Sequence, residues 1–133
     1  MPRTVHLNVM LSAPPEKLYA MYLDGKQHAA FTGGGPATIA PVVGSSWSAF
    51  DGRIHGKIQA LLPGRQIVQS WRSFEWREGE PDATLILTFA PAPGGASIDL
   101  VHSSVPDRLF ETIEAGWATR YWEPWRTFLS GGQ

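Results

Sequence analysis

The sequence has no cysteine, which excludes disulfide bonds, thiolate nucleophiles and thiolate metal sites. It has almost no net charge, since 11 Lys and Arg stand against 12 Asp and Glu, so nothing electrostatic favours nucleic acid or an anionic membrane as a partner. No apolar run approaches the ~18 residues that cross a bilayer, and residues 1–12 alternate like a strand instead of forming a signal-peptide core. We therefore expect no membrane span and, by default, a cytoplasmic location.

The residues that are present suit one folded unit with an apolar core. Of the 133 residues, 43% are hydrophobic and 17% charged, which is typical of a globular domain. The 14 glycines and 11 prolines lie between periodic runs, where they predict turns. There is no internal repeat and no heptad pattern, so we predict a single domain over residues 1–133.

The strongest pattern lies in residues 104–129, where large apolar residues recur at steps of four and three. They share one helical face: Leu109, Ile113, Trp117, Tyr121, Trp125 and Phe128. This stripe needs a broad apolar partner, because each large side chain gains roughly 1.5–3 kcal/mol on burial. Pro124 predicts a kink, since it cannot donate to the carbonyl of Arg120. Gly116 is costly within a helix, which predicts a close approach to another element.

The chain upstream of this helix alternates with a period of two, apart from two short helical segments. Residues 5–11 predict a strand, and residues 15–24 and 26–31 predict helices, the first starting at prolines followed by Glu16. Further strands are expected at 38–42, 46–51, 54–62, 65–75, 84–89 and 97–103. The order predicts an α+β fold, a curved antiparallel sheet of about six to seven strands wrapped on the long C-terminal helix, with a cavity between the two layers.

Several short motifs occur in an order typical of one family. They are Phe31-Thr32-Gly33, Pro41-Val42-Val43-Gly44, Phe50-Asp51-Gly52-x-Ile54-x-Gly56, Leu62-Pro63, the run Ile67 to Arg72, Trp76, His102, Val105-Pro106, Gly116-Trp117 and Tyr121-Trp122. Together they resemble the activator of heat-shock-protein-90 ATPase homologue family, within the START-like (helix-grip, SRPBCC) superfamily. The resemblance covers nearly the whole chain. It implies a sheet that grips the C-terminal helix around an internal hydrophobic pocket, and it implies a chaperone as one candidate partner.

The inward faces of the predicted sheet and helix supply the candidate ligand-binding residues. They are Ile58, Gln69, Trp71, Leu87, Phe89, Leu100, His102, Ile113, Trp117 and Tyr121. The aromatic members could line a pocket for a flat or lipidic ligand, with the Tyr121 hydroxyl and the indole N–H groups as polar handles. The alternative for each is ordinary core packing. His102 could orient a ligand or transfer a proton, or it could be a buried histidine with a satisfied hydrogen bond.

Other motifs do not favour a catalytic or metal site. The histidines lack the spacing of metal ligands, and the Gly33–Pro36 loop lacks the Lys and Ser or Thr of a phosphate loop. Arg72 alternates with Trp71 and should face outward, paired with a surface carboxylate. The carboxylates of Glu75, Glu78, Glu80 and Asp82 predict a solvated loop. We therefore expect no metal, no cofactor and no identifiable catalytic pair.

Three functions fit these features. The first is a non-enzymatic protein that binds a small hydrophobic or aromatic molecule between the helix and the sheet. The second is a co-chaperone-like module that acts on a heat-shock chaperone ATPase. The third is a cavity enzyme of cyclase, dehydratase or hydrolase type, which would need a second titratable group within hydrogen-bond reach of His102.

Overall fold

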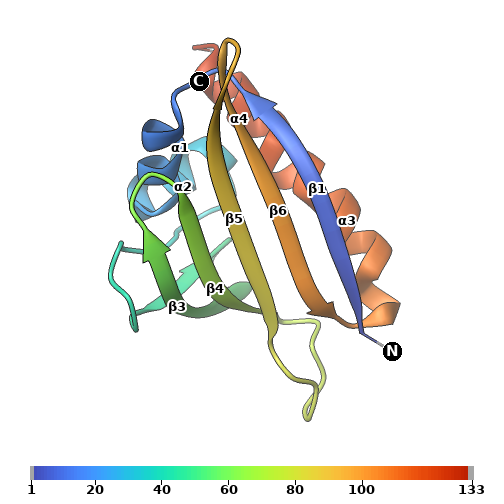
Figure 1. Ribbon diagram of the computed structural model, residues 1–133. Helices are drawn as coiled ribbons and strands as arrows, with labels where there is room; N and C mark the ends of the chain where they lie inside the picture. Colours follow the sequence, from blue (N-terminus) through green and yellow to red (C-terminus); the bar gives the residue numbers. More distant parts are fainter. Residues whose placement is uncertain (1, 132–133) are drawn as a thin grey trace.

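A six-stranded antiparallel sheet and a helical C-terminal segment form the two main layers of the computed structural model, which describes residues 2–131 (Figure 1). The strands follow the spatial order β1-β6-β5-β4-β3-β2. The elements are β1 (Arg3–Leu11), α1 (Pro15–Tyr22), α2 (Gly25–Thr32), β2 (Ser46–Ala49), β3 (Ile54–Leu62), β4 (Gln66–Ser73), β5 (Ala83–Ala92), β6 (Gly95–Val105), a 3₁₀ turn (Asp107–Leu109), α3 (Phe110–Trp117), a π turn (Ala118–Trp122) and α4 (Glu123–Leu129). The predicted fold class is confirmed.

The concave face of the sheet is the one that covers the helix. Alternate residues of the three central strands are buried as predicted: Ile67, Gln69 and Trp71 in β4, Leu85, Leu87 and Phe89 in β5, and Ile98, Leu100 and His102 in β6. Cross-strand pairs such as Gln69 with Leu85 and Leu85 with His102 continue this face from strand to strand. The period of two therefore placed the core correctly across the middle of the sheet.

Two details of the edge strands differ from the prediction. Residues 38–42 do not form a strand, because only Thr38 pairs, through an isolated bridge to Ser48. In β3 the register shifts between Ile58 and Ala60, and this bulge inverts the alternation that follows it. Leu61 is thus partly buried, whereas Leu62, which an unbroken alternation from Ile58 would place on the inner face, is exposed.

The two short helices close one end of the space between the layers. α1 begins with Pro15 in its first turn, followed by Glu16, and buries Leu18, Tyr19 and Tyr22. α2 is capped by Asp24, whose carboxylate accepts from the backbone N–H groups of residues 26 and 27. α1 packs against β5 and β6, and α2 packs against α4 and β2. These helices thereby join the sheet to the C-terminal segment.

The C-terminal segment is one continuous helical rod with a π turn in its middle. The backbone N–H of Glu123 donates to the carbonyl of Ala118, five residues earlier. Pro124 follows in the first turn of α4, where its missing N–H needs no partner. At the position where Pro124 predicted a kink, the structure has a π turn immediately before the proline-containing helix. Its extra residue brings Trp122 to the buried side together with Tyr121 and Trp125, which the regular helical stripe did not predict.

Gly116 does not mark a close approach to another element, so that prediction is wrong. A Cβ built on Gly116 meets only the Arg120 side chain, 3.9 Å from Cδ and 4.0 Å from Nε. A close approach of this kind occurs at Gly56, where a Cβ would lie 2.1 Å from the Ser70 carbonyl oxygen of the neighbouring strand.

No helix between residues 2 and 131 is long and apolar enough to cross a membrane.

These two glycines predict opposite effects of alanine on stability. Gly56→Ala forces β3 away from β4 and should lower the free energy of unfolding by about 2 kcal/mol or more. Gly116→Ala adds a methyl group without a clash and should raise it by about 0.5–1 kcal/mol. Urea unfolding followed by circular dichroism measures both, and equal changes in the two variants would contradict this account.

Candidate functional site

A cavity of about 140 Å³ lies between the C-terminal helical segment and the region of the sheet where β3 begins and β4 ends. Its apolar wall is formed by Phe50, Ile54, Trp71, Ile113, Trp117 and Tyr121. All six of these side chains are buried. A cavity of about 150 Å³ lined by apolar side chains is large enough for benzene. The space therefore suits one ring of an aromatic ligand.

The rim of the cavity is polar and exposed. Arg53 comes from the turn between β2 and β3, Glu75 from the loop after β4, and Thr112 and Arg120 from the helical segment. Phe74 also lies at the rim with 71% of its surface exposed. Gly116 and Ser73 complete the lining. Segments far apart in the chain thus meet around one opening.

A strained backbone holds the wall at Phe50. Phe50 and Asp51 have φ angles of 54° and 58°, in the left-handed region that non-glycine residues avoid, and Gly52 follows at 83°. Such a residue costs of order 1–3 kcal/mol. The Phe50 ring stands edge-on to Tyr121, 5.5 Å between centroids. A Cβ on Gly34 would lie 2.1 Å from this ring, so the glycine-rich loop leaves room for the Phe50 side chain.

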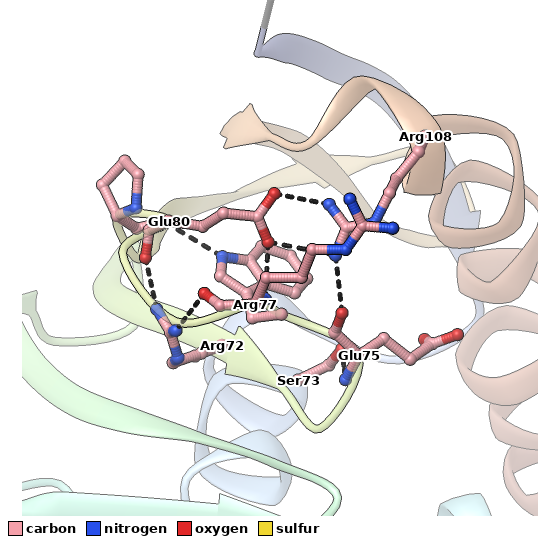
Figure 2. Close-up of polar contacts among 8 residues, drawn as sticks. Arg72, Ser73, Glu75, Arg77, Glu80 and Arg108 are labelled. Carbon is pink, nitrogen blue, oxygen red and sulfur yellow. Dashed lines mark hydrogen bonds and ion pairs between the residues drawn. The ribbon is translucent and has the colours of Figure 1, made fainter.

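Two arginines fix the loop between β4 and β5 that carries the rim residues (Figure 2). Arg72 donates to the carbonyl oxygens of Arg77 (2.9 Å) and Glu80 (2.6 Å) and to the carboxylate of Asp82 (3.1 Å), which confirms its predicted outward pairing. Arg108 donates to both carboxylate oxygens of Glu80 and to the carbonyl of Glu75 (2.7 Å). Because Arg108 directly precedes α3, this contact ties the rim to the start of the helical segment.

The same contacts revise the view of this loop as merely solvated. The Arg108 hydrogen bond, with further help from the Arg77 backbone N–H, lowers the pKa of the Glu80 carboxyl. Glu80 consequently stays ionised, and bound to Arg108, below the usual range of a glutamate. The carboxylates of Glu80 and Asp82 thus hold the loop in place, and they do not form a catalytic pair.

Two of the polar handles predicted within the pocket, the Tyr121 hydroxyl and the Trp117 indole N–H, are used inside the protein. His28 Nδ1 donates to the carbonyl of Tyr22 (2.8 Å), so its Nε2 is the acceptor for the Tyr121 hydroxyl (2.7 Å). The Trp117 indole N–H donates to His102 Nδ1 (3.2 Å). Toward the cavity, Tyr121 and Trp117 therefore contribute chiefly their rings. No motif or periodicity had singled out His28, which is fully buried and sets the orientation of Tyr121.

Buried titratable groups near the cavity are held in their neutral forms. Burial lowers the pKa of His102 to about 3 and that of His28 to about 4, and it raises the pKa of Tyr121 well above its usual value. Within residues 2–131, Trp117 is the only side-chain hydrogen-bond partner of His102, and indole does not titrate. Neither His102 nor the His28–Tyr121 pair is therefore poised for proton transfer near neutral pH, so the geometry does not favour the cavity enzyme.

Among the buried polar atoms between residues 2 and 131, four lack a hydrogen-bond partner: Gln69 Nε2, Trp71 Nε1, His102 Nε2 and Trp125 Nε1. The Gln69 carbonyl oxygen accepts from the Tyr22 hydroxyl at 2.8 Å. His102 accepts at Nδ1, so its neutral ring carries the unpartnered hydrogen on Nε2. Within the same range no three His, Asp or Glu side chains gather as a metal site would require.

The structure divides the ten predicted site residues into two groups. Trp71, Ile113, Trp117 and Tyr121 line the cavity. The other six are buried in the core outside its lining: Ile58, Gln69, Leu87, Phe89, Leu100 and His102. A ligand-binding role for any of the ten stays a prediction. The prediction omitted the rim residues and the Phe50 turn. For the turn, the sequence signal was Asp51-Gly52, a dipeptide typical of hairpin turns.

The sheet, the helical segment laid across it and the cavity between them define a helix-grip protein. The model of the family described as "Activator of Hsp90 ATPase homolog 1-like protein" matches residues 12–123. The chain therefore belongs to this family, as the ordered motifs indicated.

Relatives agree with this assignment. The chain is 32% identical over 109 residues to the human activator of 90 kDa heat shock protein ATPase homolog 1, covering 82% of this chain and 32% of that protein. It is 30% identical over 119 residues to the mouse activator homolog 2, covering 90% and 35%. The chain thus spans about a third of the length of these relatives. An HSP90 activator from Plasmodium falciparum has the same fold, with a TM-score of 0.86, 20% identity and 96% coverage of both chains.

The two buried histidines predict a loss of stability in mild acid. Both folded-state pKa values lie below the unfolded value of about 6.5, so the unfolded chain binds the protons first. Their stabilising contribution is complete above pH 6.5 and is lost as the pH falls toward 4. Each histidine should therefore make the free energy of unfolding about 2 kcal/mol lower at pH 5 than at pH 7.

Urea unfolding at the two pH values measures this loss. His102→Leu should remove about half of the difference between pH 7 and pH 5, whereas replacing the exposed His55 by Gln should leave it intact. Glu80 titrates below this window and does not contribute. A free energy of unfolding that is constant from pH 7 to pH 5 would overturn the assignment of neutral buried histidines.

Proposed function

We propose that this protein binds a small aromatic or hydrophobic molecule in the cavity between the helical segment and the sheet. The observation that supports the proposal is an apolar space of about 140 Å³, walled by four aromatic rings and open at a polar rim. Ligand sites commonly combine such an apolar interior with a few polar groups. The six other predicted residues, including Gln69 and His102, would support the wall from behind.

The size of the cavity limits the ligand and its affinity. An aromatic ring that buries roughly 150 Å² gains roughly 4 kcal/mol from burial. Before the cost of immobilisation, this corresponds to a dissociation constant of about 1 mM. A ring alone should therefore bind weakly, and a natural ligand needs further contacts at the rim. A long-chain fatty acid would leave most of its chain outside.

Filling the cavity tests this proposal. Gly116 lines the space and a side chain there meets no other element, so Gly116→Leu should occupy part of the volume and weaken ring binding at least tenfold. Ala115→Leu adds the same group one position away, on the exposed side of the helix, and should change nothing. Tryptophan fluorescence and calorimetric titrations with single-ring aromatics measure both. Equal affinities in the two variants, or no binding by the unmodified chain, would reject the proposal.

A second candidate is a co-chaperone-like action on a heat-shock chaperone, favoured by family membership and by the activators among the relatives. The chain spans about a third of these proteins, so the activity of the whole relative is a proposal for this chain. It predicts that the purified protein raises the rate of ATP hydrolysis by an Hsp90-type chaperone and sediments with it.

The chaperone experiment also separates the two candidates. Under the co-chaperone proposal, Gly116→Leu should leave the ATPase stimulation unchanged, because the substitution acts on the cavity. An unchanged hydrolysis rate together with an absence of co-sedimentation would reject the co-chaperone role while leaving ligand binding to its own test.

A further inference from the structure

Two arginines without partners flank the opening of the cavity. Arg53 lies at the start of β3, in the turn after Phe50, and Arg120 lies in the π turn next to Tyr121. Both are exposed, and within residues 2–131 neither guanidinium has a hydrogen bond or an ion pair. This is unlike Arg72 and Arg108 nearby, whose guanidinium groups are engaged by the β4–β5 loop. Among the residues that line the cavity, Arg53 and Arg120 are thus the arginines free to bind a ligand.

The side chain of Arg120 lies beside the glycine one turn earlier. The nearest atoms to a Cβ built on Gly116 are Cδ and Nε of Arg120, at 3.9 and 4.0 Å. The arginine therefore lies back along the helix over Gly116, toward the cavity that both residues line. A Cβ at Gly116 would lie at ordinary van der Waals distance from this side chain.

From this arrangement we infer that the ligand is an aromatic acid. Its ring occupies the cavity and its anionic group, a carboxylate in the simplest case, contacts Arg53 and Arg120 at the rim. The inference rests on the proposed ligand-binding function and adds the charge of the ligand. A guanidinium binds a carboxylate through two parallel N–H donors, and it remains protonated at all physiological pH values.

The other charges at the rim modify this attraction without reversing it. Glu75 is the one acidic residue among those lining the cavity, against Arg53 and Arg120. Its backbone carbonyl is held by Arg108, while its carboxylate has no partner in the described part of the chain. The rim therefore carries one net positive charge. This favours an anion over a neutral ligand, and disfavours a cation.

Three probes that share one ring and carry a polar group of different charge test the inference: 3-phenylpropionate, 3-phenylpropanamide and 3-phenylpropylamine. In each, two or three methylene groups separate the ring from the polar group, a spacing that suits a ring inside and a polar group at the rim. Calorimetric or NMR titration should show that the carboxylate binds about tenfold more tightly than the amide, with the amine weakest. Raising NaCl from 20 to 500 mM should weaken the binding of the carboxylate and leave the binding of the amide unchanged, because salt screens exposed charges.

Variants assign the preference to the two arginines. Arg53→Gln and Arg120→Gln should each lower the affinity for the carboxylate roughly two- to fivefold, as expected for partly exposed ion pairs. Neither substitution should change the affinity for the amide. The double variant should bind the two probes equally. Glu75→Gln should strengthen carboxylate binding. Arg65→Gln is the matched control, since Arg65 is exposed, has no side-chain partner within residues 2–131 and lies before the opposite end of β4.

The outcomes separate this inference from the function on which it rests. If all three probes bind equally, or if the arginine variants change amide and carboxylate alike, the cavity binds aromatics and the inference of an acid is wrong. If no probe binds at millimolar concentration, and Gly116→Leu has nothing to abolish, the proposed function itself fails. A tighter carboxylate whose advantage disappears in the double variant, and not in Arg65→Gln, supports both.

Discussion

The packing of one row of aromatic rings along the C-terminal segment is the interaction on which the remaining structure depends. Trp125 stacks on Phe31 of α2, with 4.1 Å between centroids and 12° between planes. Tyr121 meets His28 and Phe50, and Trp117 meets His102 of β6. The rod is thus attached to α2 at its end, to the β2–β3 turn in its middle and to the sheet at its beginning. The cavity is the place where these rings do not fill the space.

The hydrogen bonds between the layers show why the cavity is apolar. Two wall side chains direct their polar groups away from it, Tyr121 to His28 and Trp117 to His102. Burial keeps both histidines neutral, so no charge enters the interior. Polar and charged groups gather at the rim instead, where water can solvate them. The apolar interior therefore selects a ligand by its ring, and the charged rim selects it by its polar group.

The rim is held by contacts that lie outside the cavity. Arg108 and Arg72 bind the β4–β5 loop from two sides (Figure 2), and this loop supplies Phe74 and Glu75. On the opposite side, the strained backbone at Phe50 fixes the position of its ring in the cavity wall, and Gly34 leaves room for that ring. Backbone strain of this kind persists where the surrounding contacts determine the conformation. Family membership accounts for the shared fold.

Periodicity in the sequence determined which residues face inward, because side chains alternate along a strand and recur every 3.6 residues in a helix. It identified the two short helices, the inner faces of β4, β5 and β6, and the stripe from Ile113 to Trp125. It did not locate the bulge in β3 or the π turn. In each, one extra residue changes which later residues face inward, and no particular residue type signals the change. Those two shifts exposed Leu62 and buried Trp122. Only the tertiary structure brought Arg53, Glu75 and Arg120 around one opening, because periodicity specifies a face of each element and not the distance between faces of different elements.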